Sequence, residues 1–150
     1  MPTSARHDRS TRGGVEDALF DTSAAVPFLL EDHASRDAVV SATRLVRRGL
    51  AGHAWFETYS VLARLPGARR RSPSVIGQLL ADAFPATRSL DASAAEELAQ
   101  ELPRLGIAGG AVYDALVGAT ARAYDLVLVT RDRRAKATYD ALGVRVLFVD

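Results

Sequence analysis

The run Leu126-Val127-Leu128-Val129 is the segment that most limits what this chain can fold into. A strand with one solvated face alternates polar and apolar residues, whereas consecutive apolar residues are typical of a parallel strand covered on both faces. The run therefore predicts an α/β fold in which helices cover both sides of a mostly parallel sheet.

Signals for strands and helices alternate along the rest of the chain. Further strands are expected at residues 18–20, 50–53, 86–90 and 145–149, and helices at 24–30, 38–48, 55–65, 75–84, 94–105, 111–124 and 133–142. This order predicts one domain, an α/β/α sandwich around a central, mostly parallel sheet of about five strands.

The helix expected at 94–105 has a start signal of its own. Asp91 and Ser93 precede it, and Ser93 stands three residues before Glu96, which is the spacing of a capping box. Glu96, Glu97 and Glu101 are then expected to form a solvated face of this helix.

Composition excludes several classes of site. The chain has no cysteine, so disulfides, thiolate zinc sites and cysteine nucleophiles are excluded. No apolar run reaches the ~18 residues that a membrane span needs. Residues 1–14 are polar, lack the apolar core of a secretory signal and are expected to form a disordered tail before a domain at 15–150. We therefore expect a cytoplasmic protein that does not enter a membrane.

Four acidic residues stand where such a fold would gather side chains. Asp21 directly follows the first expected strand, and Asp132 comes shortly after the apolar run. Glu57 and Asp114 lie early in two of the expected helices. Because ligands bind beyond the carboxyl ends of parallel strands, all four positions point to one end of the sheet.

These acids have both a structural and a functional interpretation. Asp21 and Asp132 could be ordinary helix caps, and Glu57 could be a solvated helix residue. Asp114 has apolar neighbours that indicate burial, and a buried carboxylate needs a partner. Clustered carboxylates repel one another and need a cation, and oxygen ligands suit Mg²⁺ or Mn²⁺ rather than zinc.

The remaining polar residues give weaker evidence about function. The hydroxyls of Thr22, Ser23 and Thr130 could orient a carboxylate or simply form caps and turns. The histidines His7, His33 and His53 are interpreted as structural or solvated. A net charge of +1 predicts no strong overall attraction to nucleic acid.

Taken in order, the acids and their contexts resemble the PIN-domain nucleases, and within them the VapC-type toxins of type II toxin–antitoxin pairs. The matching segments are Phe20-Asp21-Thr22-Ser23-Ala24, Trp55-Phe56-Glu57-Thr58-Tyr59, Tyr113-Asp114-Ala115-Leu116 and Leu128-Val129-Thr130-Arg131-Asp132-Arg133-Arg134. The resemblance covers nearly all of residues 15–150. One departure is that Arg133-Arg134-Ala135 stands where some relatives carry a further acid, which would affect a second metal position.

The resemblance implies an endoribonuclease that depends on Mg²⁺ or Mn²⁺. Asp21, Glu57, Asp114 and Asp132 would form its acidic pocket, with Asp21 and Asp114 as first choices for direct metal ligands. It also implies a homodimer and a toxin–antitoxin hetero-oligomer, in which a small antitoxin covers the pocket and alone contacts DNA. For an RNA substrate, Arg131, Arg133 and Arg134, together with the loop at 69–71, are expected to contact the backbone.

Two other functions compete with this one. The first is a non-catalytic PIN-fold module that uses the acidic pocket only for binding. The second is a phospho-receiver signalling domain, which needs paired acids near the first strand and a lysine after a late strand. Asp21 is followed by Thr22, and the chain's one lysine, Lys136, lies within an expected helix, so the sequence favours the nuclease.

Overall fold

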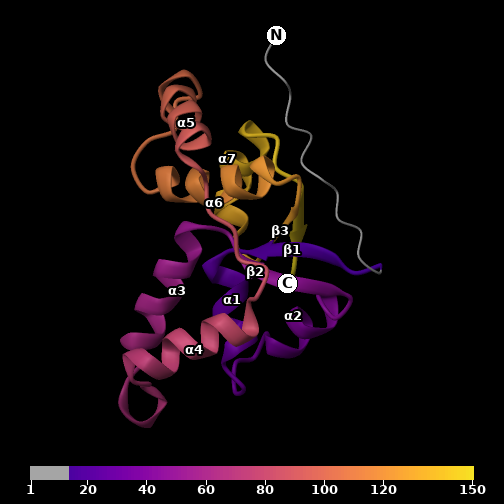
Figure 1. Cartoon of the computed structure of the whole chain (residues 1–150), viewed down its shortest axis with the longest axis vertical. Helices are drawn as coiled ribbons and strands as arrows, with labels where there is room; N and C mark the ends of the chain where they lie inside the picture. The colour runs from indigo at the N-terminus through magenta and orange to yellow at the C-terminus, as the bar shows by residue number, and fades with distance from the viewer. Residues whose placement is uncertain (1–13) are drawn as a thin grey trace.

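The computed structural model describes residues 14–150 and shows a parallel sheet between two layers of helices (Figure 1). The strands are β1 (Glu16–Phe20), β2 (Val46–Leu50), β3 (Val127–Thr130) and β4 (Val146–Phe148). They pair in the order β2-β1-β3-β4, and every pairing is parallel. The expected α/β/α sandwich is confirmed, with four strands in the described chain in place of about five.

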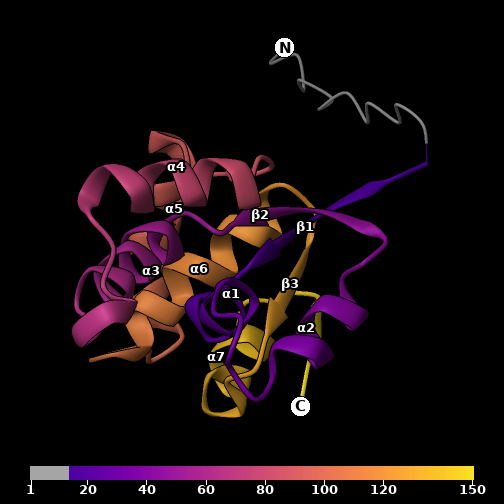
Figure 2. The same ribbon diagram turned by 90° about the horizontal axis from the view of Figure 1, so that it is seen from below.

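Helices connect the strands and cover both faces of the sheet. They are α1 (Thr22–Leu29), α2 (Arg36–Ala42), α3 (His53–Ala63), α4 (Pro73–Ala83), α5 (Ala92–Arg104), α6 (Ala111–Ala123) and α7 (Lys136–Ala141), with short 3₁₀ turns at Gly67–Arg69 and Arg133–Ala135. Figure 1 shows α5, α6 and α7 above the sheet and α1 to α4 below it, and Figure 2 gives the same layers from below.

Alternate residues of the central strands pack into two separate hydrophobic cores. Leu19 and Leu128 are fully buried against α5, α6 and α7. Phe20 and Val129, one residue further along the same strands, are buried among α1 to α4. Because successive side chains point to opposite faces, both faces must be apolar, which explains the consecutive apolar residues of β3.

The segment expected to be the third strand, 86–90, runs beside β2 without becoming a strand. It makes one isolated parallel bridge, between Ala51 and Arg88. The backbone N–H of Leu50 donates to the Thr87 side-chain hydroxyl at 2.9 Å, in place of a backbone carbonyl. This side-chain contact interrupts the ladder, so the sheet ends at β2.

The prediction of a helix over residues 38–48 is wrong for the second half of that range. Helix α2 ends at Ala42, and residues 46–48 belong to the edge strand β2 rather than to a helix. Gly49 is needed inside that strand because an added Cβ would lie 2.3 Å from the backbone carbonyl carbon of Ala86. A glycine in a strand can mark such a close backbone approach. The helical spacing of the valines in this segment favoured a helix instead.

The start and the exposed face of α5 also differ from expectation. Asp91, not Ser93, is the N-cap, and its carboxylate accepts from the backbone N–H of Ala94 at 2.8 Å. Glu101 does not belong to a solvated face, because it accepts hydrogen bonds from Arg122 of α6 at 2.7 and 3.0 Å. The pair ties α5 to α6 on the upper layer.

Two expectations about the chain as a whole remain. The tail expected at 1–14 lies outside the described residues except for Gly14, and its disorder stays a prediction. In the described part of the chain, no helix is both long enough and apolar enough to span a membrane.

The Glu101–Arg122 pair generates a prediction about stability. Hydrogen bonds from Arg122 lower the pKa of Glu101, so its contribution is present above the pKa of the unfolded chain and is lost as the pH falls through the folded-state pKa. We expect Glu101→Gln to lower the free energy of unfolding by about 1 kcal/mol at neutral pH and by less in acid. Urea unfolding at both pH values measures this, with Glu97→Gln on the exposed face as control. Equal effects of the two substitutions at neutral pH would contradict it.

Candidate functional site

The carboxyl ends of three neighbouring strands bring the four predicted acids together. Asp21 follows β1 directly, and Asp132 comes two residues after the end of β3, its neighbour in the sheet. Glu57 lies in α3, which begins three residues after β2 ends, and Asp114 lies in the first turn of α6. A small cavity of about 70 Å³ is lined by all four acids together with Thr22, Ser23, Val117 and Tyr139.

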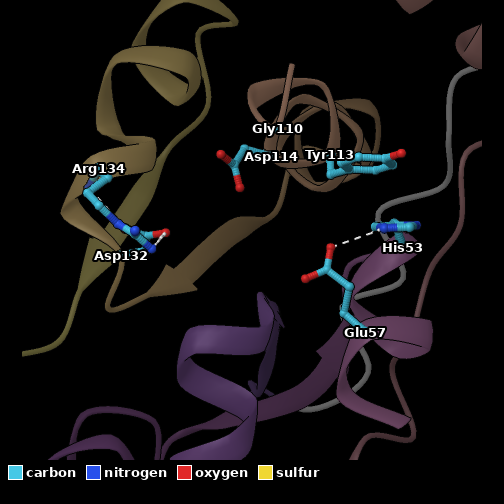
Figure 3. Close-up of a pocket in the computed structure, with 7 residues that line it drawn as sticks. All are labelled: His53, Glu57, Gly110, Tyr113, Asp114, Asp132 and Arg134. Carbon is cyan, nitrogen blue, oxygen red and sulfur yellow. Dashed lines mark hydrogen bonds and ion pairs between the residues drawn. The ribbon is translucent and has the colours of Figure 1, made fainter. Parts of the chain in front are cut away.

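A wider cleft opens outside this cavity (Figure 3). It has a volume of about 740 Å³ and is lined by His53, Glu57, Gly110, Tyr113, Asp114, Asp132 and Arg134. Glu57, Asp114 and Asp132 border both spaces, so their carboxylates stand at the boundary between them. A space this wide can admit a polymer chain to the acids, whereas the inner cavity has room only for ions or water.

Asp21 is buried and has its acceptor sites filled. It is 6% exposed. Its Oδ1 accepts from the hydroxyl of Ser23 at 2.6 Å and from the backbone N–H of Ala24 at 3.2 Å. Its Oδ2 accepts from the hydroxyls of Thr130 and, at 3.2 Å, Tyr139. Burial raises the pKa of Asp21, and these hydrogen bonds act in the opposite direction.

The predicted supporting hydroxyls lie in this network. Ser23 and Thr130 donate to Asp21, which leaves their oxygens free to accept the backbone N–H groups of Arg131 at 2.8 Å and Asp132 at 3.0 Å. The two hydroxyls therefore connect Asp21 to the loop that carries Asp132. Thr22 contacts a different acid, donating to Glu57 at 3.3 Å.

Two other acids are paired with basic or titratable side chains at the mouth of the cleft. Glu57 Oε1 lies 3.1 Å from Nε2 of His53, one helical turn earlier in α3. Asp132 accepts from the Arg134 guanidinium at 3.1 and 3.3 Å and also caps the 3₁₀ turn through the backbone N–H of Arg134. The cap interpretation of Asp132 is thus correct in geometry, and it coexists with a place in the cleft.

Asp114 differs from the other three acids. Within residues 14–150 its carboxylate has no hydrogen-bond or ion-pair partner, and it is only partly buried, not enclosed as its neighbours indicated. Burial, followed by the charges of Asp132, Asp21 and Glu57, raises its pKa. Asp114 is therefore the carboxylate with the most to gain from a cation.

Of the three arginines predicted to contact RNA, only Arg134 lies in the lining of the cleft. Arg133 pairs with Asp150 at 2.6 Å, and its guanidinium lies 4.8 Å above the Phe148 ring, outside the cleft lining. Arg131 is partly buried, and its Nε is without a hydrogen-bond partner in the described chain.

Sequence reasoning missed three residues of the site. His53, interpreted as structural or solvated, contacts Glu57 and lines the cleft. Tyr113 stacks on His53 with a centroid distance of 5.0 Å and an interplanar angle of 21°. Tyr139 reaches Asp21 from α7, across 118 residues of sequence. The i, i+4 spacing of His53 and Glu57 was a usable signal, whereas the contact of Tyr139 follows only from the fold.

The donor set suits a hard divalent cation. Carboxylate and hydroxyl oxygens line the inner cavity. Burial and then the neighbouring carboxylates raise the pKa of Asp114, and a cation would offset both effects. In the described chain no group of three acidic or histidine side chains already forms a metal site, because Glu57 and Asp132 are turned to protein partners. Mg²⁺, which retains several waters, can use such carboxylates through water.

The sequence of this chain is similar to a known family and to known proteins. Residues 18–141 match the PIN domain family model. The chain is 44% identical over 127 residues to Ribonuclease VapC27 of Mycobacterium tuberculosis (strain ATCC 25618 / H37Rv), covering 85% of this chain and 93% of that protein. It is 42% identical over 132 residues to Ribonuclease VapC40 of Mycobacterium tuberculosis (strain CDC 1551 / Oshkosh), covering 86% and 96%.

Two solved structures have a similar fold at low sequence identity. The crystal structure of FitAcB from Neisseria gonorrhoeae gives a TM-score of 0.62 at 21% identity and covers 87% of this chain and 96% of that one. The structure of FitAB bound to an IR36 DNA fragment gives 0.61 at 20% identity, with coverage of 87% and 94%.

The crowding around Asp114 predicts that its removal does not harm the fold. In the presence of EDTA, Asp114→Asn should leave the free energy of unfolding unchanged or raise it, because the amide removes a charge that is disfavoured by burial and repelled by three neighbouring carboxylates. The advantage should appear as the pH rises above the usual range of an aspartate and vanish in acid, where the wild-type carboxyl is protonated. Urea unfolding across this pH range measures it. A clear destabilisation at neutral pH would show that Asp114 holds the fold by contacts.

Proposed function

We propose that this chain, which belongs to the PIN-domain family, is a Mg²⁺- or Mn²⁺-dependent endoribonuclease and the toxin of a toxin–antitoxin pair. The observation that carries the proposal is the inner cavity lined by Asp21, Glu57, Asp114 and Asp132. The names of the relatives, both ribonucleases, support RNA as the substrate. An RNA substrate in turn supports action in the cytoplasm.

The sequence made Asp21 and Asp114 the first choices for direct metal ligands. Because Asp21 already accepts four hydrogen bonds, we propose instead that Asp114, Glu57 and Asp132 hold the cation. Asp114 has no competing partner in the described chain. Glu57 is held by His53 and Thr22, and Asp132 by Arg134, yet both carboxylates border the outer cleft. When bound, the cation would neutralise charge on a phosphodiester and activate water for attack. Asp21 would act from the base of the cavity, where its network fixes the positions of α1 and the loop after β3.

Arg134 is the proposed phosphate contact nearest to the acids. Its side chain is 93% exposed, and it lies on Asp132 at the cleft rim. Arg131 and Arg133 would contribute at a greater distance from the acids, since Arg133 is paired with Asp150. Such contacts position a backbone without reading its sequence.

The proposed protein partners follow the toxin–antitoxin assignment. We propose a small antitoxin that covers the cleft and contacts DNA, together with a homodimer of this chain. Support comes from the fold shared with FitAB, which was solved bound to DNA.

The direct test is digestion of total RNA by the purified protein. We expect cleavage in Mg²⁺ or Mn²⁺, none in EDTA, and a loss of at least about a hundredfold for Asp114→Asn, since the carboxylate proposed to hold the cation is gone. Mapping the cut ends by sequencing identifies the substrate.

The control for this test is Asp82→Asn, which removes an exposed carboxylate of α4 that accepts a hydrogen bond from the side-chain amide of Gln78. It should cleave like wild type. Unchanged cleavage by Asp114→Asn would reject catalysis at this site. A folded wild-type protein that cleaves no RNA with any divalent metal would favour the non-catalytic PIN-fold module.

A further inference from the structure

An aromatic pair forms one wall of the outer cleft and has no part in the proposed hydrolysis. Tyr113 of α6 lies nearly parallel to His53 of α3, with ring centroids 5.0 Å apart. Figure 3 shows the two rings stacked beside Glu57 and Asp114. Tyr113 remains 53% exposed despite this contact. One face of the tyrosine ring is therefore supported by the imidazole, and the residue, which lines the cleft, stays accessible to a ligand.

The position of this pair relates it to the acids. Tyr113 immediately precedes Asp114 in α6, and His53 stands one turn before Glu57 in α3. Both rings are thus fixed to the helices that carry two of the proposed metal-holding carboxylates. A group that lies on Tyr113 would be held next to a phosphate above Asp114.

The charge of the cleft shows why such a wall is needed. Its lining carries Glu57, Asp114 and Asp132 against one arginine, Arg134, which already pairs with Asp132. A polyanion gains little electrostatic attraction from this lining, unlike the basic grooves that follow a nucleic-acid backbone. Stacking of a base on an aromatic ring supplies affinity that does not depend on charge.

We propose that Tyr113, supported by His53, is the stacking platform for an unpaired nucleobase of single-stranded RNA next to the bond that is cut. The inference rests on the proposed ribonuclease function and adds a base-binding subsite to it. A base inside a duplex is stacked on its neighbours and does not reach the ring, whereas a base in a loop or single strand can lie on it. His53 is a positioning residue, since it acts through Tyr113 and Glu57.

The test measures binding separately from cleavage. The probe is a fluorescein-labelled ten-nucleotide oligouridylate, titrated by fluorescence anisotropy into full-length protein that carries Asp114→Asn, so that the probe stays intact. Adding Tyr113→Leu should weaken binding about tenfold, because the planar ring is lost, whereas Tyr113→Phe should bind within about twofold of the parent. A ten-unit abasic strand should bind weakly and equally to all three proteins.

Two controls separate a stacking role from a structural one. Phe56→Leu removes another exposed aromatic ring of α3, outside the cleft lining, and should leave binding unchanged. His53→Phe keeps a ring under Tyr113 and should bind like the parent, whereas His53→Ala should bind more weakly. The inference would be overturned if the Tyr113→Leu protein bound oligouridylate as tightly as the Tyr113→Phe protein does. It would also be overturned if Tyr113→Leu weakened binding of the abasic strand as much as binding of oligouridylate.

A second measurement covers the case in which Tyr113→Leu fails to fold. One uridine of the probe is replaced by 5-iodouridine, and the cross-linked peptide of the parent protein is mapped by mass spectrometry. We expect the cross-link at Tyr113 or His53. A cross-link confined to another peptide, such as the arginine loop at 69–71, would reject the platform. Cleavage of total RNA by wild type, measured in parallel, reports on the proposed function independently.

Discussion

The hydrogen bonds that enclose the Asp21 carboxylate are the interaction on which the rest of the site depends. They join the end of β1 to the start of α1 through Ser23 and Ala24, to the end of β3 through Thr130, and to α7 through Tyr139. Burial alone would favour the neutral acid, and these donors offset that cost. The network thereby fixes the end of the sheet beside which the other acids lie.

The other acids illustrate how a fold tolerates crowded negative charge. Glu57 contacts His53, and the charge of Asp132 is offset by Arg134, in pairs at the cleft mouth that solvent can reach. Asp114 has no such partner in the described chain, and its pKa is raised by burial and by its neighbours. Exposed pairs of this kind are weak, so a cation can displace them at little cost. The structure thus retains one uncompensated carboxylate where a cation would be most useful.

The sequence predicted the layers and the acids because both follow local rules. The apolar run of β3 required two covered faces, and Asp21 and Asp132 had to lie near strand ends. It failed where contacts between distant segments decided the outcome: Gly49 allows the backbone of Ala86 to approach, and Thr87 interrupts a fifth strand. The stacking of Tyr113 on His53, sixty residues apart in the chain, was missed for the same reason, whereas the i, i+4 spacing of His53 and Glu57 was a local signal.

The central claim is that crowded carboxylates at the end of this sheet form a divalent-cation site. Calorimetric titration of Mn²⁺ into the metal-free protein tests it most directly. The account predicts saturable binding that Mg²⁺ competes for, and binding at least about tenfold weaker in Asp114→Asn than in Asp82→Asn. Equal affinity of the two variants for Mn²⁺, or no binding by a folded wild-type protein, would contradict it.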